Sequence, residues 1–337
     1  MAAYIARRLL LSVFTIVMIS MLSFFIIELP EGDLATKRHA RTLSHTFSIA
    51  QTDAMTDELR RYLGLDRPIY VRYGLWVWNM MQGDLGRSFP DGGTIVLQVP
   101  VKQVIGDRLF TTVALTGFTM LVTWTFAIPI GIYSAVRQHT VGDYAFTLLG
   151  FTGLAVPDFL LGLVLMYIAF AYFDQSVGGL FSTDYDAAPW SLAKVNDLVK
   201  HLWIPAIVLG TSGTASLIRI MRNNLLDELG KPYVVTARAK GVHPLKLIVK
   251  YPVRVAINPL ISTVGYLLPS LVSGSVIVSV VLSLPTIGPV LLTAILDEDI
   301  HLAGFLVLTL GVLTVLGTLI SDILLGVVDP RIKYTGQ

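Results

Sequence analysis

Few residues of this chain could carry chemistry, and the familiar catalytic patterns are absent. The one Gly-Lys pair, Gly230-Lys231, runs into Pro232 and lacks the glycine-rich loop that cradles a phosphate. No His-Glu-x-x-His occurs, and none of the six histidines lies well inside an apolar run. The small residues at 210–213 faintly resemble a nucleophile turn, but in an apolar helix such residues usually serve close packing. We therefore predict no catalytic residue, no metal ligand and no ATP hydrolysis by this chain.

Asp158 is the exception among the apolar segments, because it follows Pro157 inside the run 144–173. An ionisable group at membrane depth costs roughly 2.5–3.5 kcal/mol, so it should face the protein interior or a wet cavity. Two interpretations stay open. Asp158 either satisfies backbone N–H groups freed by the break at Pro157, or it contacts a solute or a partner subunit.

A basic loop at 233–244 is the other informative segment. Pro232 can open a short helix, Gly241 is placed to end it, and Pro244 follows as is common after a helix cap. Arg238 and Lys240 fall near the C-terminal end, where the helix dipole favours cations. The pattern predicts a short, rigid, basic helix. The alternative is that the segment is only a solvent-exposed cytoplasmic loop.

The elements that position these residues are apolar helices. The chain has 337 residues, 54% of them hydrophobic and 14% charged, with a mean hydropathy of +0.69. About 20 apolar residues cross a bilayer, so the runs 9–27, 109–136, 144–173, 202–218, 260–284 and 302–321 predict six transmembrane helices. The piece 286–296 is too short to cross. Residues 9–27 lack a small-x-small cleavage pattern, which favours a retained helix over a secretory signal.

The distribution of charge predicts the orientation. The short segments assigned to one side hold thirteen of the 25 Lys and Arg residues. Those assigned to the other side hold two Lys residues and seven acidic residues. By the positive-inside rule both termini should be cytoplasmic, and the long polar segment 30–108 should form an extracytoplasmic domain. The net charge of +2 gives no case for nucleic acid, and the absence of cysteine excludes disulfides.

Several motifs in order along nearly the whole chain resemble one family. The loop carries Thr236-Ala237-Arg238-Ala239-Lys240-Gly241, with Asn258-Pro259 downstream. Before it come Arg7-Arg8, Leu63-Gly64-Leu65-Asp66, Tyr73, Trp76 and Gly83-Asp84-Leu85-Gly86-Arg87-Ser88, and after it Ser273-Gly274-Ser275 and Asp329-Pro330-Arg331. The chain resembles the permeases of binding-protein-dependent ABC transporters, in the dipeptide/oligopeptide form and of the first permease subunit type.

That resemblance implies an all-α integral membrane protein with the type I ABC importer permease fold. Its parts would be an N-terminal transmembrane helix at 1–29, the extracytoplasmic segment 30–108, a five-helix core at 109–328 and a cytoplasmic tail at 329–337. The loop within 222–257 would be the EAA loop, and Thr236, Ala237, Arg238, Ala239, Lys240 and Gly241 would couple it to an ATPase. Ala237, Ala239 and Gly241 would be the positions of close contact.

The family also implies partners and a location. These are a second homologous permease, two ATPase subunits that bind ATP and Mg, an extracytoplasmic solute-binding protein, and the cytoplasmic membrane of a prokaryote. The chain would need no cofactor of its own and would form half of the pathway for peptides or peptide-like solutes.

The sequence departs from the family pattern at a few positions. Ser279 replaces a commonly acidic residue and Thr286 a common glycine, which makes Ser279 a second candidate for the pathway, beside Asp158. Tyr251-Pro252 places a helix breaker where the family usually continues a helix. These departures leave open a cargo of oligosaccharide, glutathione or nickel. A secondary transporter driven by an ion gradient is the less favoured alternative, since it would want several buried carboxylates or an inverted repeat.

Overall fold

The computed structural model describes most of the chain. The described residues are 2–28, 57, 60, 61, 64, 66–88, 99–173, 178–186, 188–273, 276–297 and 299–328. Part of the predicted segment 30–108, the Ser273-Gly274-Ser275 motif beyond its first residue, and the predicted tail 329–337 lie outside them.

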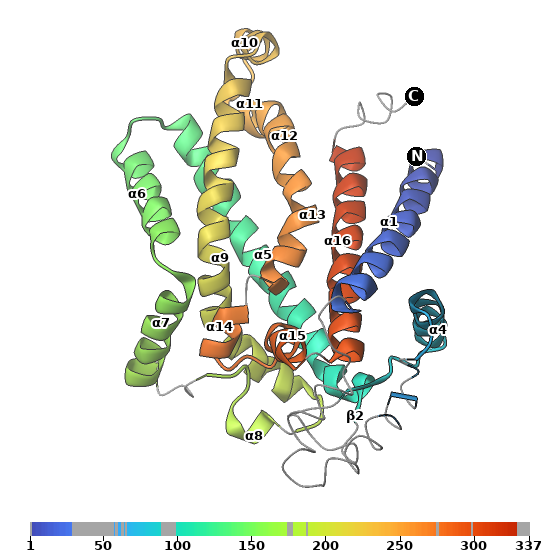
Figure 1. The fold of residues 1–337 in the computed structure, drawn as a ribbon. Coiled ribbons are helices and arrows are strands. Elements are labelled where there is room, and N and C mark those ends of the chain that lie inside the picture. The colour runs from blue at the N-terminus through green and yellow to red at the C-terminus, as the bar shows by residue number, and fades with distance from the viewer. Residues whose placement is uncertain are drawn as a thin grey trace. The chain divides into compact units, whose positions relative to one another are not determined.

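The described part of the chain is almost entirely helical. The helices are α1 Ala2–Glu28, α4 Ile69–Met81, α5 Val101–Val136, α6 Val141–Ala155, α7 Asp158–Phe173, α8 Thr183–Asp186, α9 Leu192–Leu229, α10 Pro232–Ala239, α11 Pro244–Lys250, α12 Pro252–Ala256, α13 Asn258–Ser273, α14 Val276–Val281, α15 Ile287–Leu296 and α16 Ile300–Val328 (Figure 1). Two short strands, β1 Arg87–Ser88 and β2 Val99–Pro100, pair antiparallel, with Arg87 opposite Pro100.

The chain divides into two compact units. The larger comprises Met1–Leu10, Thr111–Thr286 and Leu313–Gln337, and the smaller comprises Leu11–Phe110 and Ile287–Val312. Helices α1, α5 and α16 contribute to both units.

Five stretches within the described residues are long and apolar enough to cross a membrane. They are Ala6–Phe25, Val101–Val136, Leu192–Leu229, Pro244–Gly265 and His301–Val328. A sixth is present if α6 and α7, which are bent by 103° at their junction, form one span. Helix α15, with 10 residues, is shorter, as its sequence predicts.

The prediction of a single helix over 144–173 is wrong. Helix α6 ends at Ala155, and α7 begins at Asp158. Pro157 lacks an N–H and disfavours helical backbone in the residue before it. Val156 accordingly adopts an extended conformation, with φ −81° and ψ 124°. Asp158 therefore lies at a helix start and not in the middle of a straight span.

The apolar run 260–284 also differs from its prediction. Its described parts are α13, which ends at Ser273, and α14, which covers Val276–Val281. The stretch that meets the length and composition of a span starts earlier, at Pro244. Short helices α11 and α12 meet at Tyr251, because Pro252 cannot donate the hydrogen bond that would continue α11.

Helix α9 is the central element of the larger unit and packs against α6, α7, α12 and α13 (Figure 1). Leu217, Met221 and Leu225 of α9 form one apolar cluster with Ala127 and Leu260. Glycines allow close approach elsewhere along α9. A Cβ added at Gly210 would lie 2.9 Å from Oγ1 of Thr123, so the small residues at 210–213 serve packing, as their composition predicts.

Three contacts within the larger unit join the end of α16 to α1, α12 and α13. Arg8 pairs with Asp322 at 3.0 Å. Nε of Arg254 donates to the carbonyl of Val328 at 3.2 Å. The hydroxyl of Ser321 donates to the carbonyl of Ile261 at 2.8 Å. The start of α1, the end of α16 and helix α12 therefore lie at the same end of this unit.

In the smaller unit, α4 lies against α1. The hydroxyls of Ser20 and Tyr73 are 2.8 Å apart, and Arg72 forms an ion pair with Glu28. The rings of Tyr73 and Trp76 pack on Phe24 with centroids 5.6 and 5.5 Å away. These contacts explain why an aromatic pair occurs at this spacing in the polar segment.

A hydrogen bond from the run Gly83–Ser88 joins the polar segment to the start of α16. Oδ1 of Asp84 accepts from the N–H of Gly86 at 3.0 Å and shapes the turn. The hydroxyl of Ser88 donates to Oδ2 of buried Asp299 at 2.6 Å. Oδ1 of the same carboxylate accepts from the N–H of Leu302 at 3.0 Å and caps α16.

Candidate functional site

Helix α10 begins and ends where the sequence predicts. Pro232 occupies the first turn, where its missing N–H is not needed. Gly241 follows the helix with φ +74°. Its N–H donates to the carbonyl of Arg238 at 3.0 Å, and the N–H of Val242 donates to that of Ala237 at 3.3 Å. This pair of bonds is a Schellman cap, which requires left-handed backbone at the glycine.

The inner face of α10 packs on α11 and forms its own small core. Val234, Ala237 and Leu247 are buried together, and Val242 and Tyr251 cover them. The contact between Val242 and the cluster around Ala237 is the hydrophobic contact that usually accompanies a Schellman cap. The small side chain of Ala237 is therefore used within the chain, with 7% of its surface exposed.

The exposed residues of α10 and its cap include two cations, Arg238 and Lys240. Thr236, Arg238, Ala239, Lys240 and Gly241 are exposed. A Cβ added at Gly241 would meet nothing within 4 Å. Of the six predicted coupling residues, these five are exposed, and Ala237 is buried against α11.

A hydrogen bond joins α10 to the helix before it, because Tyr233 donates to the carboxylate of Glu228 near the end of α9. Helix α10 projects at one end of the larger unit, beyond the ends of α9 and α11 (Figure 1). The arrangement is a short, capped helix on a rigid base, offering a small, positively charged face.

The two candidate pathway residues occupy different environments. Asp158 is half-buried at the first position of α7, where the helix dipole favours a negative charge. Ser279 is fully buried in α14, and its hydroxyl oxygen accepts from the hydroxyl of Thr286 at 3.0 Å. Gly162 of α7 packs near Leu282. Within the described residues, no hydrogen bond joins Asp158 to Ser279.

The pair Ser279–Thr286 connects two positions at which the sequence departs from the family pattern. The hydroxyl of Thr286 donates to that of Ser279 in a buried setting, so removing either hydroxyl would leave the other without this partner. Sequence reasoning named both residues but did not predict the contact between them.

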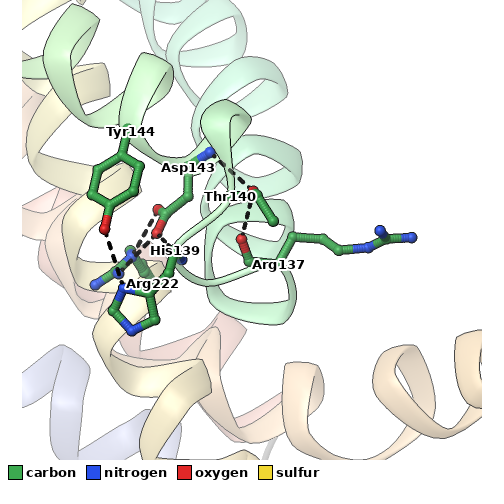
Figure 2. A network of polar contacts seen from close by, with 6 residues as sticks. All are labelled: Arg137, His139, Thr140, Asp143, Tyr144 and Arg222. Carbon is green, nitrogen blue, oxygen red and sulfur yellow. Dashed lines mark hydrogen bonds and ion pairs between the residues drawn. The ribbon is translucent and has the colours of Figure 1, made fainter.

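A polar network at the start of α6 was missed by sequence reasoning. Buried Asp143 accepts two hydrogen bonds from Arg222 of α9 and one from the backbone of His139 (Figure 2). The only local signal is Thr140, three residues before Asp143, which caps α6. In the part of the chain that is described, no group of three His, Asp or Glu residues could hold a metal ion.

The fold defines a multi-pass α-helical membrane protein with a capped helix presented at one end. Residues 127–334 match the family described as the binding-protein-dependent transport system inner membrane component. The chain belongs to this family and is a membrane component of a binding-protein-dependent transport system.

Similar full-length proteins have related names. The chain is 35% identical to the oligopeptide transport system permease protein AppB of Bacillus subtilis, over 99% of this chain and 100% of that protein. It is 30% identical to a putative peptide permease protein of Brucella ovis, with the same coverage of both chains. It is 29% identical to the dipeptide transport system permease protein DppB of Escherichia coli, over 99% of each.

Proposed function

We propose that this chain forms half of the translocation pathway of an ATP-driven importer of peptides. A second permease pairs with it, two ATPase subunits dock on the cytoplasmic side, and a solute-binding protein delivers cargo from outside. ATP and Mg belong to the ATPase subunits, and this chain carries no cofactor. The assignment of peptides is supported by the names of full-length relatives from three genera.

The observation that carries this proposal is the construction of α10. Energy released by partner ATPases can move membrane helices only through an element that does not deform. Helix α10 has a proline start, a Schellman end and a packed inner face, which together make such an element. Its exposed face, with Arg238 and Lys240, is the surface we assign to the ATPase.

Purification of the chain from its native membrane tests this function. We expect the complex to contain two ATPase subunits and a second permease, and its ATP hydrolysis to rise when a peptide-loaded binding protein is added. A purified chain that transports a solute with an ion gradient and without ATPase subunits would contradict the proposal.

We further propose six spans in the cytoplasmic membrane of a prokaryote, with α6 and α7 together forming the third. Both termini and α10 would be cytoplasmic, and residues 30–108 would be extracytoplasmic. The excess of Lys and Arg on the pieces assigned to the cytoplasm supports this orientation. The proximity of Arg8 to Asp322 supports an even number of crossings.

Single cysteines test this topology, because the chain contains none. Asp66 and Lys240 are both exposed. In intact cells, a membrane-impermeant maleimide should label Asp66→Cys and should not label Lys240→Cys. After permeabilisation both should react, which controls for accessibility. The reverse labelling pattern would overturn the orientation.

The role of Asp158 is tested by two substitutions at matched membrane abundance. If Asp158 lines the pathway, its charge should attract a cationic part of the cargo, such as a peptide amino terminus. An opposite charge at 4 Å is worth about 4 kcal/mol at an effective dielectric constant near 20, before the cost of desolvation. Asp158→Asn should then reduce uptake severalfold.

Asp158→Leu serves as the comparison for that experiment, since it removes both the charge and the hydrogen-bonding capacity. A purely structural role at the start of α7 should survive in Asp158→Asn, because Asn keeps the size and the hydrogen-bonding capacity of the side chain. If uptake by the Asn variant equals that of the wild type and only the Leu variant fails, the pathway role is wrong.

A further inference from the structure

The buried carboxylate of Asp143 joins the start of α6 to α9 and accepts three hydrogen bonds. Nε of Arg222 donates to Oδ1 of Asp143, and a terminal NH2 donates to Oδ2, both at 3.2 Å. The N–H of His139 donates to Oδ2 at 3.1 Å. Such a two-pronged pair fixes orientation as well as distance. Asp143 is buried, whereas the Arg222 side chain is partly exposed.

The same carboxylate orders the turn between α5 and α6. His139 has φ +58°, a left-handed backbone conformation that residues other than glycine rarely adopt. Its N–H donates a hydrogen bond to Asp143. Thr140 accepts from the N–H of Asp143 and donates to the carbonyl of Arg137 at 2.7 Å. The side chain of Arg137 points away from the carboxylate (Figure 2). Asp143 therefore joins α9 to this turn as well as to α6.

The rest of the α6–α9 contact includes small residues on both helices. Gly150 faces Ala215, and a Cβ added at Gly153 would lie 2.6 Å from Cγ2 of Thr211. The hydroxyl of Thr211 bonds within its own helix, to the carbonyl of Ile207. Small-residue surfaces permit close approach, but none of these apolar contacts is directional. Among the described hydrogen bonds, those of Asp143 and Arg222 supply the directional link between α6 and α9.

We infer that the Asp143–Arg222 pair is a positioning pair that makes α6, the α5–α6 turn and α9 move as one body. Arg222 lies in the last two turns of α9, which leads through Gly230 directly into α10. A displacement of α10 would therefore be transmitted to the end of α9 that carries Arg222. With the pair intact, α6 and the turn must follow; without it, α9 can slide on the glycines of α6.

This inference rests on the proposed function, because it assigns the pair a part in transmitting movement from α10. A purely structural role makes a different prediction. A pair needed only for folding would change the amount or the melting temperature of the complex, whereas a positioning pair would change how strongly loaded binding protein stimulates ATP hydrolysis.

The test uses the purified complete transporter, reconstituted in lipid nanodiscs. ATP hydrolysis is measured without and with binding protein saturated with peptide, and the ratio of the two rates is the stimulation ratio. Arg222→Gln removes the charge and half of the fork, and Arg222→Lys keeps the charge but loses the fork. Arg219→Gln is the matched control, since Arg219 is an exposed arginine of the same helix.

We expect Arg222→Gln to lower the stimulation ratio about fivefold or more, in the range of ordinary coupling between sites. Arg222→Lys should be intermediate, and Arg219→Gln should match the wild type. Asp143→Asn combined with Arg222→Gln should be no worse than Arg222→Gln alone, as expected for two residues acting through one contact.

The outcomes are separable. If Arg222→Gln does not assemble, Arg222→Lys at matched abundance provides the measurement. A wild-type ratio in the assembled variant, with only its melting temperature lowered, would overturn the inference. An equal loss in Arg219→Gln would overturn it as well. A wild-type preparation without ATPase subunits would instead count against the proposed function.

Discussion

Replacing Gly241 by valine is expected to lower peptide uptake at least tenfold while the permease still inserts into the membrane. Gly241 has φ +74° in the Schellman cap of α10. Left-handed backbone costs an ordinary residue about 1–2 kcal/mol, and a β-branched residue more. The variant should lose the cap, fray α10, and add bulk to the face that we assign to the ATPase. We expect uptake and stimulated ATP hydrolysis to fall together by at least tenfold, roughly the effect of 1.4 kcal/mol.

The matched control for this variant is Gly230→Val at the other end of α10. Gly230 has φ −83°, which valine can adopt, and a Cβ there also meets nothing within 4 Å. Both variants add the same side chain to an open position, so a difference between them reports the left-handed cap together with the added bulk on the face that we assign to the ATPase. Normal stimulation by the Gly241→Val complex would falsify the assignment of α10 as the coupling element.

The second large effect is expected from Gly86→Ala in the turn that leads to α16. A Cβ at Gly86 would lie 2.8 Å from Nδ1, 2.9 Å from Cγ and 3.2 Å from Cβ of His301. Since the ring and the Cβ atom of His301 are both too close, rotation of this side chain cannot relieve the clash. The contact between Ser88 and Asp299 lies two residues away and should be lost with it. Overpacking of this kind usually costs about 1–3 kcal/mol.

Gly83→Ala isolates the steric contribution. Gly83 has φ +82°, close to the +81° of Gly86, but a Cβ there would meet nothing within 4 Å. The two variants therefore carry the same backbone penalty and differ in the contact with His301. The measurement is the thermal melting of the purified complex and the membrane abundance of each variant. Equal losses in both would show that the approach to His301 contributes nothing.

Sequence reasoning succeeded where the signals are local. The start of α10 at Pro232 and its end at Gly241 each follow from a residue that restricts its own backbone. The prediction of one helix over 144–173 is wrong, because Pro157 indicates an interruption but not the angle of the bend. The 103° bend depends on what α6 and α7 pack against.

Contacts between distant residues could not be predicted. Asp143 and Arg222 are 79 positions apart, and Ser88 and Asp299 are 211 positions apart, so no periodicity links either pair. The inward direction of Ala237 was missed for another reason. Its small size suggested contact with another subunit, but the hydrophobic partners on α11 come from a separate helix.

The pairing of the first helix with the last has a consequence for biosynthesis. Arg8 is matched with Asp322, and a Cβ at Gly311 would lie 2.5 Å from Cγ2 of Ile19, so α1 approaches α16 closely. A ribosome adds about 5–20 residues per second, so α16 is completed roughly 15–60 s after α1. During that interval α1 must wait in the bilayer for its partner. A chain that stops before α16 would leave this surface of α1 without its partner helix.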